Sequence, residues 1–149
     1  MQALYARELA GGDPKAHVYT LIEPDLEDDP ETLDFAKRLF ATTIERSDAI
    51  DEIIGAHTKN WDLHRITAVD RSLIRIATAE LLAFEDIPPK VSVDEAIEIA
   101  KTYSTPRSGT FVNGVLDAIL IDLEQQDRLQ KSGRGLVGIE EVRERAESS

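Results

Sequence analysis

The sequence of 149 residues contains no cysteine, which excludes disulfides, thiolate metal sites and cysteine nucleophiles together. Basic residues are also scarce: 17 lysines and arginines stand against 29 acidic residues, so the net charge is −12. Surfaces that bind nucleic acids or anionic membranes non-specifically are usually basic, and this charge disfavours both. No apolar run approaches the roughly 18 residues of a membrane span, and no signal peptide opens the sequence. The sequence therefore predicts a cytoplasmic protein that makes no contact with membranes.

Residues that would carry catalysis or hold a metal are equally sparse. The closest pair of histidines, His57 and His64, is too widely spaced for two ligands on one face of a helix. No phosphate-binding GxxxxGK[ST] loop, no GxGxxG after a strand and no nucleophile elbow is found. We therefore expect neither an enzyme nor a metal site nor any other cofactor.

The sequence does contain apolar residues at helical spacing along most of its length, and hydrophobic residues make up 42% of it. The pattern is strongest over residues 69–84 and 111–123, and two short apolar segments lie within the first 22 residues. This periodicity predicts an all-α fold of about seven helices in one domain over residues 1–127. The polar residues 128–149 are expected to form a flexible C-terminal tail.

Capping signals indicate where several helices begin. Asp29 followed by Pro30 is typical of a helix start, since the side chain can accept a backbone N–H and proline suits the first helical position. Three further starts are expected on the same grounds, at Ser47, at Thr67 with Asp70, and at Ser92 with Glu95. Gly114 lies inside a helical pattern, where we expect it to let another helix approach closely.

Three motifs in the second half carry a resemblance to a known family. They are DRSLIRIA from Asp70 to Ala77, VSVDEA from Val91 to Ala96, and FVNGVLD from Phe111 to Asp117. In this order and spacing they resemble the bacterial NusB family of transcription antitermination proteins. The block QALY from Gln2 to Tyr5 extends the resemblance, which covers residues 2 to about 124.

The resemblance implies a NusB-like fold of two helical subdomains and a function without catalysis. Family members bind the single-stranded boxA element of nascent RNA together with the small-subunit ribosomal protein that serves as Nus factor E. Through RNA polymerase elongation complexes they promote read-through of terminators, above all in ribosomal RNA operons. Family members also carry an arginine-rich stretch before the QALY block, so we expect the natural start to lie upstream of Met1.

The resemblance, together with helix-terminus chemistry, identifies candidate RNA-binding residues. They are Gln2, Tyr5, Asp70, Arg107, Ser108, Thr110 and Phe111.

Each of the candidates in the second half has a structural alternative. An exposed Phe111 would stack on a base for ~1–3 kcal/mol, but it also begins an apolar helix face and would equally serve the core. Asp70 would accept a base amino group, or it would simply pair with Thr67 at a helix start. Ser108 and Thr110 would donate to phosphate or cap the helix, whereas Arg107 favours phosphate over the alternative of an ordinary surface arginine.

Two other functions stay open. One is an RNA-recognition domain of the kind fused to ribosomal RNA cytosine methyltransferases, although the polar tail leaves no room for a catalytic domain. The other is an acidic helical module that binds proteins only. Whether the chain forms dimers is also open.

Overall fold

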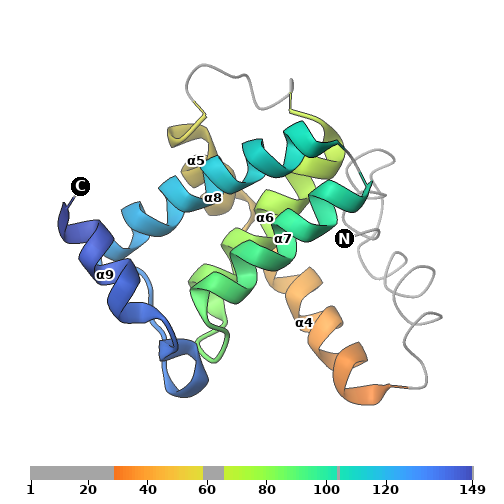
Figure 1. Cartoon of the computed structure of the whole chain (residues 1–149). Coiled ribbons are helices and arrows are strands. Elements are labelled where there is room, and N and C mark those ends of the chain that lie inside the picture. The colour runs from red at the N-terminus through yellow and green to blue at the C-terminus, as the bar shows by residue number, and fades with distance from the viewer. Residues whose placement is uncertain (1–28, 59–65, 104, 149) are drawn as a thin grey trace.

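The computed structural model describes residues 29–58, 66–103 and 105–148 (Figure 1). These residues form helices and no strand, which confirms the all-α prediction. They fold into six α-helices and one 3-10 helix: α4 (Pro30–Glu45), α5 (Ser47–Ala56), α6 (Ala68–Ala83), α7 (Pro89–Tyr103), α8 (Pro106–Gln125), η3 (Gly133–Leu136) and α9 (Ile139–Ser148). The two apolar segments expected within the first 22 residues lie outside the described residues.

Helix α6 forms the centre of the molecule and contacts α4, α5, α7 and α8. Helices α7 and α8 pack along each other in opposite directions in front of α6 (Figure 1). The core includes aliphatic residues of α5, α6 and α8 with no exposed surface, namely Ile54, Ile74, Leu116, Ile119 and Leu123. None of the helices in the described ranges is long and apolar enough to cross a membrane.

Two of the expected helix starts form with the predicted hydrogen bonds. Asp29 Oδ1 accepts from the backbone N–H of Thr32 at 3.2 Å, and Pro30 is the first residue of α4. The Thr32 hydroxyl also donates to Asp29, and these bonds lower the pKa of the Asp29 carboxyl. At the start of α6, Thr67 Oγ1 accepts from the N–H of Asp70 at 3.2 Å.

The other two expected caps are wrong. Helix α5 follows α4 directly through Arg46, and no side chain caps its first turn. Helix α7 begins at Pro89, before the expected cap, because proline's fixed φ suits the first turn of a helix. Ser92 consequently lies inside α7, where its hydroxyl donates to Glu80 Oε2 at 2.9 Å.

The close helix approach expected at Gly114 occurs instead at Gly109. Gly114 is exposed, and a Cβ built on it would meet nothing within 4 Å. A Cβ on Gly109 would lie 2.8 Å from Lys101 Cγ, so the absence of a side chain lets Lys101 of α7 lie across α8. The sequence pattern placed Gly114 in a helix and Gly109 in the loop before it, whereas both lie in α8, and it did not show which face of the helix each one occupies.

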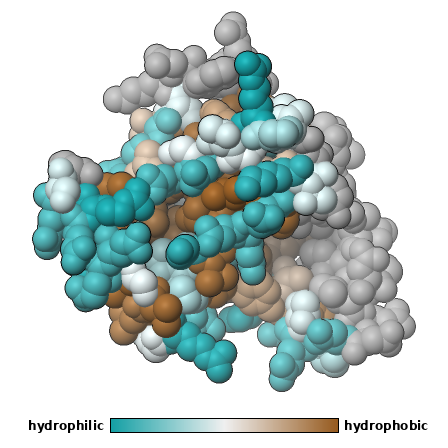
Figure 2. Space-filling model, in the orientation of Figure 1, coloured by the Kyte–Doolittle hydropathy of each residue, from teal (hydrophilic) through white to brown (hydrophobic). Residues whose placement is uncertain are grey.

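Residues 133–136 and 139–148 form helices within a segment where the sequence led us to expect a flexible polar tail. Leu129, Ile139, Val142 and Ala146 are buried, and α9 packs against α8. Only three inward positions on α9 are apolar, and most of its other residues are charged, so the apolar periodicity of this helix is weak in the sequence. Figure 2 shows the hydrophilic outer surface of α9 and a hydrophobic area over the connection that leads into it, where Leu136 and Val137 are exposed.

Lys131 links this C-terminal segment to the end of α6 through two hydrogen bonds. Its ammonium donates to the carbonyl oxygens of Glu80 at 3.1 Å and Phe84 at 2.8 Å, and a cation is favoured at a helix C-terminus. Burial lowers the pKa of Lys131 to about 8. Next to it, the N–H of Ser132 donates to Glu85 O at 2.9 Å, so two consecutive residues hold the segment against the turn between α6 and α7.

Candidate nucleic-acid interface

The candidate residues that the structure describes lie at one end of the molecule. Because α6, α7 and α8 run in alternating directions, the N-terminal ends of α6 and α8 lie on the same side (Figure 1). Asp70 lies in the first turn of α6, and Arg107, Ser108, Thr110 and Phe111 lie in the first two turns of α8. Gln2 and Tyr5 lie outside the described residues. The fold therefore brings five of the seven candidates to a common end.

The start of α8 is arranged to attract an anion. Thr105 is the N-cap, and its hydroxyl oxygen accepts from the N–H of Ser108 at 3.1 Å. Pro106 follows, and Arg107 is exposed in a first turn that contains no acidic residue. The unpaired N–H groups and the dipole of a helix N-terminus favour negative charge, and Arg107 adds a full positive charge there. This end of α8 suits a phosphate group.

Ser108 and Thr110 occupy different environments. Ser108 is buried, with only 7% of its surface exposed, so its position does not suit direct contact with a ligand, and its backbone N–H is the group that Thr105 caps. Thr110 is exposed, and its hydroxyl makes a long 3.4 Å contact with Pro106 O. Thr110 can therefore turn its hydroxyl to a phosphate beside Arg107.

Phe111 combines the two roles that the sequence left open. It is partly buried and packs against the hydrophobic core, yet it lies one turn into α8 with part of its surface exposed. A ring held by the core on one side loses little entropy when a base stacks on its exposed side.

Asp70 presents a buried carboxylate oxygen with no partner in the described part of the chain. The residue is 5% exposed, and Asp70 Oδ1 accepts no hydrogen bond there. Thr67 caps the backbone N–H of Asp70, but this leaves Oδ1 itself unsatisfied. An unsatisfied buried acceptor is costly, so a hydrogen-bond donor is favoured at this position, and a ligand would reach the oxygen only after the groups that cover it move aside.

Lys101 is a basic residue of this end that the sequence reasoning missed. Its aliphatic stem lies against Gly109 of α8, and its exposed ammonium lies 3.7 Å from Glu98. A glycine just before a predicted helix, eight positions after a lysine, was the available signal. It could be interpreted only once α7 and α8 were known to pack as neighbours.

Within the described ranges, no group of three or more histidine, aspartate and glutamate side chains could hold a metal ion. The site therefore consists of a helix N-terminus, an arginine, a hydroxyl, an aromatic ring and a buried carboxylate.

A model of the NusB family matches residues 1–120 of the chain. The chain belongs to the NusB family. NusB proteins are transcription antitermination factors and not enzymes, in agreement with the prediction from the sequence.

Similar proteins extend over nearly the whole chain. The transcription antitermination protein NusB of Salinibacter ruber is 59% identical over 149 residues, which cover 100% of this chain and 93% of the relative. That of Chloroherpeton thalassium is 43% identical over 145 residues, which cover 97% of this chain and 69% of the relative.

Solved NusB structures share the fold. The T. maritima NusB structure has a TM-score of 0.73 and 39% identity, covering 79% of this chain and 82% of that one. A structure of the antitermination factors NusB and NusE in complex with dsRNA has a TM-score of 0.73 and 29% identity, covering 78% and 86%. These matches confirm the NusB-like fold predicted from the sequence.

Proposed function

We propose that this NusB-family chain binds single-stranded boxA-type RNA together with the small-subunit ribosomal protein that serves as Nus factor E. In this proposal the complex acts on RNA polymerase in the cytoplasm and promotes read-through in ribosomal RNA operons. The observation that carries the proposal is the start of α8, where Arg107, an acid-free first turn and the partly exposed Phe111 lie together. The solved complex of a NusB relative with NusE and dsRNA supports it.

Each side chain has a distinct task in this proposal. Arg107 and the N-terminal N–H groups of α8 hold a phosphate, and Thr110 adds a hydroxyl donor. Phe111 stacks on an unpaired base, and Asp70 Oδ1 accepts a base amino group, which adds specificity more than affinity. Gln2 and Tyr5 complete the proposed set. The proposed function involves no chemical reaction, because the chain only binds the RNA and the ribosomal protein.

The ribosomal partner has an electrostatic task. With a net charge of −12, the chain repels RNA at long range, whereas a basic partner bound beside the site would offset this repulsion. We therefore expect RNA affinity to rise strongly when the partner is present.

The test is fluorescence anisotropy of a labelled single-stranded boxA-type RNA, titrated with the chain alone and with the ribosomal protein. Because the related complex contains dsRNA, a duplex of the same sequence is titrated in parallel. Binding of the single strand that requires or is strongly enhanced by the partner supports the proposal. An absence of RNA binding in both conditions, with the partner still bound to the chain, would favour the protein-binding module instead.

A further inference from the structure

Two helices bring basic side chains to the start of α8. Arg107 is the second residue of α8, and Lys101 lies in the last turn of α7. Lys101 meets α8 at Gly109, where a built Cβ would lie 2.8 Å from Lys101 Cγ and 3.3 Å from Cε. Residues 107 and 109 are about 200° apart around the helix axis. The two basic side chains therefore lie on different faces of the same turn.

The ammonium of Lys101 lies close to this first turn. Its Nζ is one C–N bond of about 1.5 Å beyond Cε, so it lies within about 5 Å of the Cβ position of Gly109. The stem lies against α8, yet the side chain is 56% exposed, so a ligand can reach its charged end. Packing along the stem therefore limits where the ammonium can go before a ligand binds.

Lys101 also forms an ion pair with Glu98, one turn earlier on α7. The distance from Lys101 Nζ to Glu98 Oε1 is 3.7 Å, and both side chains are more than half exposed. Exposed ion pairs of this length are weak because water and salt screen them. A phosphate at the start of α8 can therefore draw Lys101 away from Glu98.

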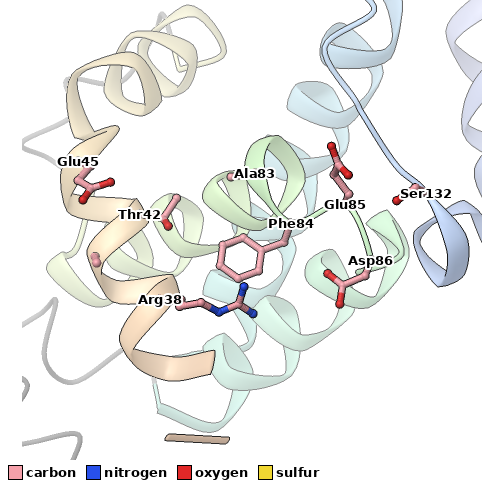
Figure 3. A pocket seen from close by; sticks show the side chains of 9 residues that line it. Arg38, Thr42, Glu45, Ala83, Phe84, Glu85, Asp86 and Ser132 are labelled. Atoms are coloured by element: carbon pink, nitrogen blue, oxygen red, sulfur yellow. The ribbon is translucent and has the colours of Figure 1, made fainter. Parts of the chain in front are cut away.

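The opposite end of α6 carries the opposite charge. Exposed carboxylates surround a groove there, those of Glu45, Glu85 and Asp86 (Figure 3). Arg38, which also lines the groove, places its guanidinium 5.3 Å from the centre of the Phe84 ring. Acidic side chains repel phosphate, whereas the first turn of α8 contains no acidic residue. Phosphate is therefore favoured at the end where Arg107 and Lys101 lie.

We propose that Lys101 binds a second phosphate of the RNA, next to the one held by Arg107, and that Gly109 is a positioning residue that leaves room for the Lys101 stem. This inference rests on the proposed RNA binding and deepens it, because it adds a contact from α7 to a site formed by α6 and α8. Asp70 Oδ1, a buried acceptor with no partner in the described part of the chain, lies at the same end and independently favours a donor there.

The test is anisotropy of labelled single-stranded boxA-type RNA with the full chain and the ribosomal partner, at several salt concentrations. Lys101→Gln keeps most of the stem and removes the charge. We expect the affinity to fall about threefold to tenfold, and the slope of log K against log salt to fall by about 0.7, the contribution of one phosphate. The control Lys90→Gln makes the same change at the other, exposed end of α7 and should leave the affinity within about twofold of wild type.

Two further variants test the second phosphate and the competing acid. The double variant Arg107→Ala/Lys101→Gln should lower the salt slope by about 1.4, because two phosphate contacts are lost. Glu98→Gln removes the acid that pairs with Lys101, so it should tighten RNA binding about twofold to fivefold. Glu141→Gln, an equal charge change at an exposed position of α9, should leave the affinity unchanged.

Gly109→Ala tests the positioning role. The new Cβ would push the Lys101 stem away from α8, so RNA affinity and salt slope should both fall toward the values of Lys101→Gln. In a Lys101→Ala background no stem is displaced, and Gly109→Ala should then have no further effect. Equal losses in both backgrounds would show that the alanine disturbs α8 itself and would remove this role from Gly109.

The outcomes separate this inference from the RNA proposal. If wild type binds RNA but Lys101→Gln leaves the salt slope unchanged, or Lys90→Gln has an equal effect, Lys101 holds no phosphate and the RNA proposal still stands. A double variant with no larger slope change than Arg107→Ala alone would also overturn the second phosphate. If wild type binds no RNA with its partner present, both proposals are overturned.

Discussion

At the scale of single residues, Phe111 contributes both to the stability of the fold and to the proposed RNA binding. Because it packs against the core, truncation to alanine would disturb folding and binding together. Phe111→Leu keeps an apolar side chain but loses the ring, so we expect RNA affinity to fall about fivefold to a hundredfold, from ~1–3 kcal/mol of stacking. Anisotropy gives the affinity and thermal unfolding gives the Tm. A large drop in Tm with unchanged affinity would assign Phe111 to the core alone.

Glu80 is a second residue whose environment predicts a measurable effect. It is 6% exposed and accepts from the Ser92 hydroxyl at 2.9 Å, and burial raises the pKa of its carboxyl. The folded state therefore keeps this proton to higher pH than the unfolded chain does. Stability consequently falls as the pH rises from about 4.5, the ordinary value, through the raised pKa.

Glu80→Gln should remove this pH dependence while a glutamine oxygen still accepts from Ser92. We expect the free energy of unfolding of the variant, relative to wild type, to increase with pH across that window and then to level off. Urea unfolding between about pH 4 and 8 measures it, and Asp94→Asn on the exposed face of α7 serves as the control. If the difference in unfolding free energy between the variant and wild type does not change with pH, the raised pKa of Glu80 is contradicted.

At the scale of the elements, replacing each of two glycines with alanine is expected to change the stability of the protein in opposite directions. Gly114 is exposed within α8 and has open space around it, so Gly114→Ala should stabilise the protein by ~0.5–1 kcal/mol. A Cβ on Gly135 would lie 1.8 Å from Glu85 O, which forces the backbone of the C-terminal segment to move. Gly135→Ala should therefore cost ~1–3 kcal/mol. Thermal unfolding of both variants checks the pair, and the same direction of change in both would contradict the structure.

The elements also show how far the sequence could be interpreted. Features that depend only on neighbours in the sequence were predictable. They include the helical period of residues 69–84 and 111–123 and the caps at Asp29 and Thr67. The roles of Ser92 and Gly109 depend on contacts with Glu80 and Lys101, each of which lies on a neighbouring helix. The helices of residues 128–148 are stabilised by contacts with α6 and α8 that no local pattern encodes.

The candidate site was predictable to the same limited degree. The motif around Phe111 predicted a helix from residue 111, whereas α8 already begins at Pro106, and the capping hydroxyl belongs to Thr105 and not to Ser108 or Thr110. The sequence did not separate buried Ser108 from exposed Thr110, because their exposure follows from how α7 packs on α8. The unpartnered oxygen of Asp70 was equally invisible without coordinates.

At the scale of the whole molecule, charge predicts how RNA binding responds to salt. The chain carries −12 overall, so its proposed affinity for RNA depends on a few local cations and not on a basic surface. Arg107→Ala should therefore lower the slope of log K against log salt by about 0.7, the contribution of one phosphate on a single strand. Arg134→Ala, an equal charge change at exposed η3, should leave the slope unchanged. Equal effects of both variants would show that only net charge matters.

For the whole molecule, we propose that RNA binds at the end where α6 and α8 begin. The most direct measurement is ultraviolet crosslinking of a boxA-type single-stranded RNA containing 4-thiouridine to the chain in the presence of its ribosomal partner, with the sites mapped by mass spectrometry. We expect crosslinks within residues 105–111, at Phe111 above all. Crosslinks confined to α9 or to the turn between α6 and α7 would contradict it.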